Sequence, residues 1–173
     1  MPLIVPFAEA TPKIDPTAWV APNATLIGSV GLGAHASVFY GAVIRADRDQ
    51  IRVGAGSNIQ DNVVLHTDSG LPLTVGSRVS IGHGAIVHGC TIGDDCLIGM
   101  GATIMNGAVI GAGSLIAAGA LVLEYTSVPP GSLVMGSPAK ALRSLTPDEQ
   151  VGLIENARHY AELSQAHRAA NPS

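Results

Sequence analysis

The stretch CLIGMGATIMNGAVIGAGSLIAAGALVL, which runs from Cys96 to Leu123, places a branched aliphatic residue at every sixth position. The members of this series are Ile98, Ile104, Ile110, Ile116 and Val122. An amphipathic helix would repeat about every 3.6 residues and a half-buried strand every second residue, so neither explains the pattern. A period of six is typical of a repeat architecture in which each short unit makes one strand and one turn.

The series extends in both directions, with two interruptions. Toward the C-terminus it continues through Val128 and Val134. Toward the N-terminus it passes through Ile92, Ile86, Ser80 and Thr74, then, after three extra residues, through Leu65, Ile59 and Val53, and, after three more, through Ile44, Val38, Leu32, Leu26, Val20 and Ile14. All of these positions except Ser80 and Thr74 hold Ile, Leu or Val. The interruptions, around Asp47–Gln50 and after His66, are expected to be loops.

This repetition predicts a parallel β-helix, an all-β fold. Three hexapeptides make a triangular coil of about 18 residues, and successive coils stack at the strand spacing of about 4.8 Å. The repeated aliphatics point inward. The composition agrees, because 47% of residues are hydrophobic but only 3% are aromatic, and 21 of 173 are glycine. Every third member of the series shares a face, so Ile44, Leu65 and Ile86 should stack on one face, and Ile59 and Ser80 on the preceding one.

A different pattern follows residue 140, in TPDEQVGLIENARHYAELSQAHRAA. Thr146 suits the N-cap of a helix, Pro147 suits its first position, and Glu149 completes a capping box. Apolar residues then recur at helical spacing: Leu153, Ile154, Ala157, Tyr160, Ala161 and Leu163. We therefore expect a β-helix over residues 1–140 and, over residues 141–173, a C-terminal α-helix that packs back along it.

Charge and composition exclude several classes of function. The net charge is −4 with nine Lys and Arg residues and no basic cluster, so nucleic acid is not an expected partner. The N-terminus lacks the basic region of a signal peptide, and no apolar run suits a membrane span. Two cysteines make no disulfide framework, so we expect a cytoplasmic protein with reduced thiols. Cys90 and Cys96 fall among small corner residues, which favours packing over a metal or redox role.

Three histidines stand out within the repeat. SIGHGAIVHGC, from Ser80 to Cys90, contains His83 and His88, and His66 precedes them in VVLHTD. Their spacing alone is weakly specific, so incidental polar side chains remain an alternative to a metal site. The other histidines are expected to be ordinary surface or packing residues at a turn and on the helix: His35, His159 and His167.

The repeat fixes rough positions for the three histidines. Arg45 and His66 each follow a ladder aliphatic of one face, and His88 lies on the next coil of that face. The three are therefore expected to line one edge, whereas His83 lies with Gln60 on another face, out of their reach. A threefold trimer would set the two histidines of one copy against the third of its neighbour. Three imidazoles with an open fourth position are the ligand pattern of catalytic zinc.

Longer stretches resemble the gamma-class carbonic anhydrase-like family. They are GAVIRADRDQIRVGAGSNIQDNVVLHTD, IGHGAIVHGC, IGMGATIMNGAVIGAG and GSPAK, and they carry the motif order R-x-D, N-x-Q-D, H, H-x4-H. The resemblance covers nearly the whole chain and implies left-handed coils and a homotrimer with three metal sites between subunits. By the match, His66 and His88 of one chain and His83 of its neighbour bind Zn²⁺, with Fe²⁺ or Co²⁺ as other suitable metals.

The same resemblance implies roles for further polar residues. Arg45 would pair with Asp47 and, across the subunit boundary, with Asp61. Gln60 would hydrogen-bond to metal-bound hydroxide, accompanied by Asn58. An ion pair that only holds the trimer is the alternative for Arg45, and a turn-forming role is the alternative for Asn58.

The implied activity is the reversible hydration of CO2 to bicarbonate by a metal-bound hydroxide. Tyr160 resembles a family tyrosine that approaches the site from the helix, with packing of that helix as the alternative. The chain departs from the best-studied type of the family at two places. Arg48 follows Asp47, and the short loop after His66 has Asp68 as its one acid, so no proton-transfer group is obvious.

Two other functions stay open. A hexapeptide acyltransferase using acetyl-CoA would share the repeat and the trimer, but it relies on one histidine base and needs no metal triad. A non-catalytic trimeric scaffold or small-ligand binder could keep the metal for assembly.

Overall fold

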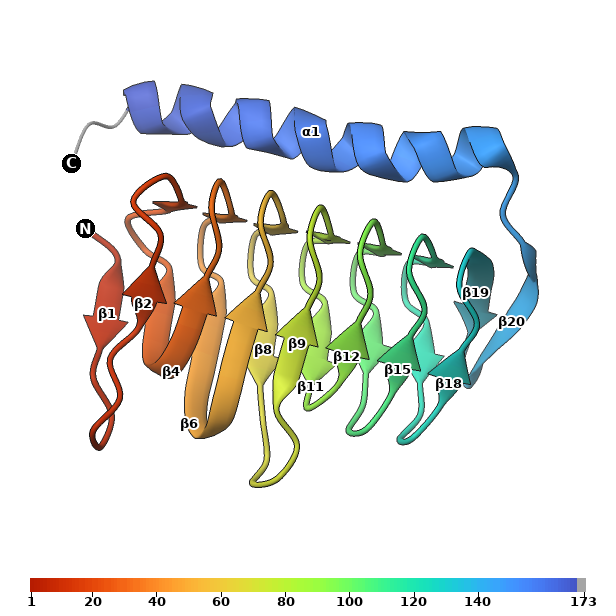
Figure 1. The fold of residues 1–173 in the computed structure, drawn as a ribbon, viewed down its shortest axis with the longest axis horizontal. Coiled ribbons are helices and arrows are strands. Elements are labelled where there is room, and N and C mark those ends of the chain that lie inside the picture. The colour runs from red at the N-terminus through yellow and green to blue at the C-terminus, as the bar shows by residue number, and fades with distance from the viewer. Residues whose placement is uncertain (171–173) are drawn as a thin grey trace.

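The structure is a computed structural model that describes residues 1–170, and they form a triangular prism with one long helix along its side (Figure 1). Residues 171–173 of the expected helical segment lie outside the described part. The short strands wind as a parallel β-helix, as the six-residue repeat predicts. Its coils are left-handed, as the family resemblance implies. Within residues 1–170, no helix has both the length and the apolar composition that a membrane crossing requires.

The prism has three faces, numbered here in the order in which a coil crosses them. Face 1 consists of β1 (Leu3–Val5), the first halves of β4 (Thr25–Leu32) and β6 (Val43–Val53), β8 (Val64–His66), β11 (Ile86–His88), β14 (Thr103–Ile104) and β17 (Leu121–Val122). Face 2 consists of β2 (Lys13–Ile14), the second halves of β4 and β6, β9 (Leu73–Val75), β12 (Thr91–Ile92), β15 (Val109–Ile110) and β18 (Ser127–Val128).

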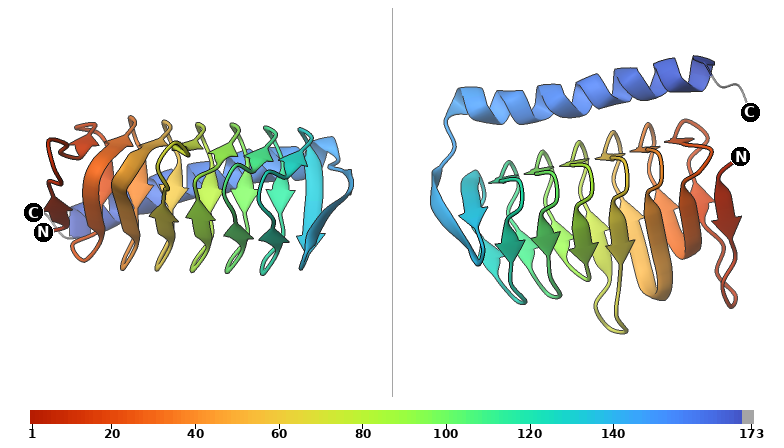
Figure 2. Two further views of the ribbon diagram at one scale, coloured as in Figure 1. Left: turned by 90° about the horizontal axis from the view of Figure 1, so that it is seen from below. Right: turned by 180° about the vertical axis from the view of Figure 1, so that it is seen from behind.

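Face 3 is the face that the helix covers, and it closes the prism (Figure 2). It consists of β3 (Trp19–Val20), β5 (Ser37–Val38), β7 (Asn58–Ile59), β10 (Ser80–Ile81), β13 (Leu97–Ile98), β16 (Leu115–Ile116), β19 (Ser132–Gly136) and β20 (Ala139–Ser144). Every pairing between these strands is parallel except β19 with β20, which is antiparallel. The boundary expected at residue 140 falls inside β20.

The inward ladders confirm the repeat but correct its register between residues 74 and 92. The ladder residues there are Val75, Ile81 and Val87, each one position after the expected Thr74, Ser80 and Ile86. Leu65 consequently stacks on Val87, and Ile59 on Ile81. Ile86 instead points outward and is 45% exposed.

Two compensating changes of length produce this shift. The loop after His66 is one residue longer than expected, and the step from Val87 to Ile92 is one residue shorter, so the series returns to register at Ile92. Ile86 and Val87 are both branched aliphatics, so the sequence pattern does not distinguish which of them points inward.

Ile81→Ala is expected to lower the free energy of unfolding by about 2–5 kcal/mol, because the fully buried side chain leaves a cavity in the face 3 ladder. Val109→Ala, at an outward position of face 2, should change it by less than about 0.5 kcal/mol. Urea unfolding followed by circular dichroism at one fixed protein concentration measures both. Equal effects would contradict this assignment of inward and outward positions.

The helix α1 (Pro147–Ala170) begins as the sequence predicts. The Glu149 N–H donates to Thr146 Oγ1 at 3.2 Å, and the Thr146 N–H donates to Glu149 Oε2 at 2.8 Å, which confirms the capping box. The Arg143 guanidinium, 2.7 Å from Glu149, is the main reason that the pKa of this carboxyl falls to about 2. These contacts fix where the chain leaves β20 and turns onto face 3.

The far end of α1 is tied to the first coils. The Tyr40 hydroxyl lies 2.9 Å from His167 Nδ1, and Arg168 donates to the carbonyl oxygens of Thr17 and Ala18. Leu153 and other inward residues of α1 are buried against face 3. The helix is therefore held at both ends, which sets the position of Tyr160 near its middle.

Candidate metal centre

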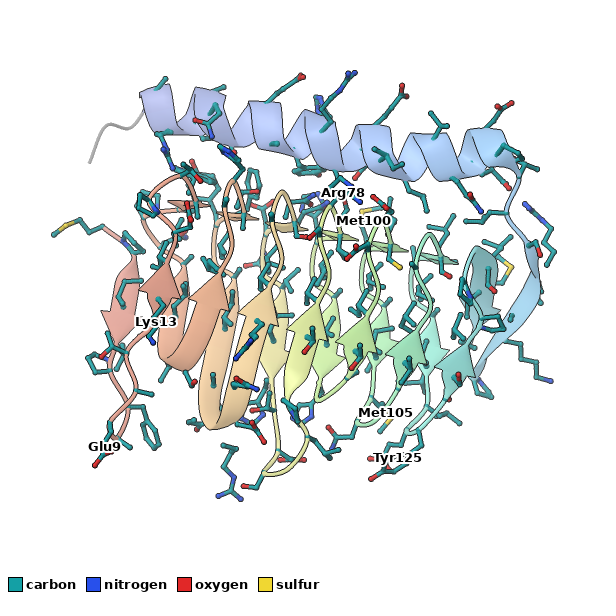
Figure 3. The ribbon with its side chains drawn as sticks, viewed as in Figure 1. Glu9, Lys13, Arg78, Met100, Met105 and Tyr125 are labelled. Atoms are coloured by element: carbon teal, nitrogen blue, oxygen red, sulfur yellow. The ribbon has the colours of Figure 1, made fainter. Side chains whose placement is uncertain are left out.

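The corner between faces 1 and 2 carries the first group of polar side chains. Arg45, His66 and His88 occupy one register position on adjacent coils, because β6 pairs Arg45 with His66 and β8 pairs His66 with His88. This confirms that the three line one edge. This edge lies on the side of the prism opposite α1. The loop between β8 and β9 projects from it, and Met105 and Tyr125 lie farther along the same edge (Figures 1 and 3).

The two imidazoles of this corner face each other. His66 Nδ1 lies 2.8 Å from His88 Nε2. The outer nitrogen of His66, Nε2, lies 2.9 Å from Asp47 Oδ1, and the outer nitrogen of His88, Nδ1, lies 2.6 Å from Asn106 Oδ1. A cavity of about 300 Å³, lined in part by His88, Asn106 and Glu124, opens beside the pair.

The outer partners determine which nitrogens carry protons. A carboxylate and an amide oxygen only accept hydrogen bonds, so both outer nitrogens must be N–H groups. When both rings are neutral, each carries its one N–H on the outer nitrogen. The inner nitrogens of His66 and His88, 2.8 Å apart, then both present lone pairs. Two facing lone pairs repel, and the gap therefore suits a cation. Histidines that ligate metals in proteins generally donate their other N–H to a carboxylate or carbonyl in this way.

Asp47 is held as a carboxylate. Burial works to raise the pKa of its carboxyl, but hydrogen bonds from Arg45 and His66 outweigh burial and leave the pKa below its ordinary value. The Arg45 guanidinium donates to Asp47 Oδ2 at 2.6 Å, which confirms the expected pair. Asp47 thus accepts from the arginine with one oxygen and from His66 with the other.

The corner between faces 3 and 1 carries the second group, around His83. His83 Nδ1 lies 2.8 Å from Asp61 Oδ2, and His83 Nε2 lies 3.2 Å from the Tyr160 hydroxyl. Burial, and then the charge of Asp61, raise the pKa of Tyr160, so its hydroxyl remains a donor at neutral pH. His83 therefore donates from Nδ1 to the carboxylate and accepts at Nε2 from the tyrosine.

A chain of buried amides lies beside His83. Gln60 Nε2 donates to Asn58 Oδ1 at 3.0 Å, and Asn58 Nδ2 donates to Ser80 Oγ at 2.9 Å. In this order of donors, Gln60 Oε1 is left as an acceptor. Gln60, His83 and Tyr160 line one end of a cavity of about 420 Å³ between α1 and face 3.

The two groups do not meet within one chain. In residues 1–170, no three His, Cys, Asp or Glu side chains are arranged to hold a metal ion. The structure thus agrees with the expectation that His83 lies away from His66 and His88. Each corner is a half-site, and we call them the histidine-pair corner (Arg45, Asp47, His66, His88) and the His83 corner (Asn58, Gln60, Asp61, His83, Tyr160).

The two cysteines lie elsewhere, inside the prism. Cys90 is 2% exposed and Cys96 is fully buried. Burial raises the pKa of the Cys90 thiol to about 12 and that of Cys96 to about 11. Thiols with such pKa values remain protonated and unreactive, as the packing role predicted from their corner positions requires.

The sequence did not predict that Asn106 contacts His88 or that Asp68 binds Asn106. Asn106 Oδ1 contacts His88, and Asn106 Nδ2 donates to Asp68 Oδ2 at 2.9 Å. The available signal was positional: Asn106 is a polar residue at the corner position of the coil that follows His88. Because asparagine is common at turns, its position alone does not single it out.

The coils and the two histidine corners define a hexapeptide-repeat β-helix protein. Residues 89–124 match the family model described as bacterial transferase hexapeptide (six repeats), and residues 72–105 match the hexapeptide repeat of succinyl-transferase. Among solved structures, a hexapeptide transferase family protein from Anaplasma phagocytophilum superposes with a TM-score of 0.92 at 44% identity, covering 95% of this chain and 97% of that one.

Similarity to curated relatives identifies the family within the hexapeptide-repeat proteins. A Methanocaldococcus jannaschii protein named "probable carbonic anhydrase" is 51% identical over 146 residues, which cover 84% of this chain and 92% of that protein. The Arabidopsis thaliana protein named gamma carbonic anhydrase 2, mitochondrial, is 42% identical over 169 residues and 94% of this chain. The chain therefore belongs to the gamma carbonic anhydrase-like family of hexapeptide-repeat proteins. It spans 61% of the length of the Arabidopsis relative.

Proposed function

We propose that the protein is a gamma-type carbonic anhydrase, which catalyses the reversible hydration of CO2 to bicarbonate at sites shared between copies of the chain. The observation that carries the proposal is the geometry of the histidine-pair corner. The outer nitrogens of His66 and His88 donate to Asp47 and Asn106, so in neutral rings the inner nitrogens face each other with free lone pairs. Family membership and the names of the relatives support the reaction.

The surface between the two corners supports a homotrimer. The outward stripe of face 1 is mostly apolar and runs through Leu3, Thr25, Val43, Val64, Ile86, Thr103 and Leu121. The outward stripe of face 2 is mostly polar and runs through Lys13 (Figure 3), Gly31, Arg52, Thr74, Thr91, Val109 and Ser127. Val64 and Ile86 are 38% and 45% exposed, which is costly unless they are covered.

Both histidine corners border face 1. If three prisms turn face 1 toward a common axis, their apolar stripes meet there, and each histidine-pair corner meets the His83 corner of the next copy. The same arrangement brings Arg45 of one copy toward Asp61 of its neighbour. One packing therefore covers the apolar face and completes three sites.

The metal would be held by His66 and His88 of one copy and His83 of the next. Imidazole suits Zn²⁺, Fe²⁺ and Co²⁺, and we propose zinc. When bound, the metal supplies a Lewis acid that lowers the pKa of water toward neutrality.

The remaining chemistry belongs to the side chains. Asp47 holds the proton of His66 on Nε2, and Asp61 holds that of His83 on Nδ1. Only Nε2 of His83 is then left to bind a metal, so the hydrogen bond from Tyr160 must break when a site forms. Gln60, oriented by Asn58, offers Oε1 to orient the attacking water.

His88→Ala should weaken metal binding by more than about 100-fold, because losing an outer partner of a ligand alone typically costs 10–100-fold. The trimer should stay folded, since His88 lies outside the ladder. Metal per chain by mass spectrometry after dialysis, with sedimentation for assembly, measures both. His159→Ala, at an exposed position of α1, is the control and should keep its metal. A variant at residue 88 that retains stoichiometric metal would refute the ligand assignment.

Stopped-flow CO2 hydration by metal-quantified protein tests the activity itself. Metal-dependent hydration supports the proposal. Stoichiometric metal without hydration would favour the non-catalytic scaffold, and thermal stabilisation by coenzyme A without metal would favour the acyltransferase. A cytoplasmic location is part of the proposal, and fractionation of the source cells tests it.

A further inference from the structure

Asn106 lies between a proposed metal ligand and a loop acid, and no role has been assigned to it. Its Oδ1 accepts from His88 Nδ1 at 2.6 Å, and its Nδ2 donates to Asp68 Oδ2 at 2.9 Å. Asn106 follows β14, one coil beyond His88, whereas Asp68 belongs to the loop that begins directly after His66. One amide therefore joins two coils and a loop.

Asp68 determines which way this amide points. An asparagine can present either its oxygen or its nitrogen to a neighbour. A carboxylate accepts only, so Asp68 requires the NH2 group and leaves the oxygen facing His88. With the oxygen facing it, His88 must carry its proton on Nδ1.

The surrounding backbone is built to admit this contact. Gly89 follows His88 with φ = +47°, and a Cβ there would collide with Asn106 Oδ1. The loop is held from the other side, since the Asp49 N–H donates to Thr67 Oγ1 at 3.1 Å and Asp49 Oδ2 accepts from the Gly70 N–H at 3.0 Å. Asp68 is thus fixed between two anchored positions.

We propose that Asn106 and Asp68 form a positioning relay that holds the His88 proton on Nδ1 and so keeps its Nε2 lone pair directed at His66. The inference rests on the proposed metal-dependent function. It gives the short loop after His66 a different task from proton transfer, because the Asp68 carboxylate is engaged by Asn106. Neither residue touches the reacting atoms; both act through His88.

The first test is the tautomer of His88 in metal-free protein. Long-range ¹H–¹⁵N spectra of histidine-labelled protein identify which ring nitrogen carries the proton. The native protein should show Nδ1–H at His88, and Asn106→Leu, which keeps the volume but removes the acceptor, should lose this single tautomer. An unchanged spectrum in Asn106→Leu would overturn the relay. This readout needs no metal, so it separates failure of the relay from failure of the proposed function.

The second test is metal affinity, measured by competition with a chelator. Asn106→Leu should bind Zn²⁺ about 10–100-fold more weakly, as loss of an outer partner does at other metal sites. Asp68→Ala frees the amide to flip and should give a smaller loss. The exchange Asp68→Asn with Asn106→Asp keeps one donor and one acceptor in each contact and should restore affinity to within about threefold.

The matched control is Asn23→Leu. Asn23 is also a corner asparagine, and its Oδ1 accepts from the Gly41 N–H at 3.1 Å. Within residues 1–170, no hydrogen bond joins it to a histidine. It should lower thermal stability while leaving Zn²⁺ affinity unchanged. Equal losses of affinity in Asn23→Leu and Asn106→Leu, or failure of the exchanged pair to bind better than Asn106→Leu, would overturn the proposal.

Discussion

Co-expression of His83→Ala with His88→Ala chains is expected to restore about a quarter of the native metal content, although each variant alone binds almost none. In the proposed trimer, a site needs the histidine pair of one copy and His83 of the next. In the mixture, a His83→Ala chain keeps an intact pair and a His88→Ala chain keeps an intact His83. Random assembly puts both kinds in about three quarters of the trimers, and each such trimer has one intact junction among three.

The comparison for this result is co-expression of His66→Ala with His88→Ala. Both substitutions damage the same corner, so no arrangement of copies contains an intact pair, and the metal content should stay near zero. Differently tagged chains and two-step purification isolate the mixed trimers, whose metal is then counted. If complementation fails in trimers shown to contain both chains, the site is not shared in the way proposed.

The architecture could be predicted from the sequence because one physical demand recurs at every strand. Each coil must bury an aliphatic on each face, and this demand places Ile98, Ile104 and Ile110 at a regular interval that the sequence displays directly. The capping box at Thr146 was predictable for the same reason, since it depends on residues close in sequence.

The register between residues 74 and 92 was not predictable, because neighbouring residues there are apolar for two different reasons. Val87 serves the inner ladder, and Ile86 serves the outward stripe of face 1. A periodic pattern cannot separate a residue that is apolar for the core from a neighbour that is apolar for another surface. The wrongly assigned position, Ile86, thus lies in the surface proposed for the contact between copies.

The candidate site also has one part that the repeat predicts and one part that it does not. That Arg45, His66 and His88 share an edge follows from the repeat, because equal positions on successive coils stack. The contact of Asn106 with Asp68 joins residues of different corner positions and sequence-distant loops. No periodicity marks such a contact, because it depends on side-chain reach and on the path of the loop.

Ile86→Lys is expected to convert the trimer into monomers and to remove the metal along with the assembly. Ile86 lies in the centre of the apolar stripe of face 1, between Val64 and Thr103. In the trimer, three lysine ammonium groups would approach one axis without partners, and an unpaired charge buried at an interface costs several kcal/mol. The monomer should stay folded, because the side chain points away from the ladder at Val87.

The comparison that isolates the surface is Val109→Lys. Val109 is 47% exposed against 45% for Ile86, and it holds the corresponding outward strand position on face 2, between Thr91 and Ser127. Both variants add the same charge to a strand, so any difference in β-propensity cancels. Sedimentation and metal content should remain native for Val109→Lys and change to monomeric and metal-free for Ile86→Lys. A trimeric, metal-bound Ile86→Lys protein would mean that face 1 does not form the contact between copies.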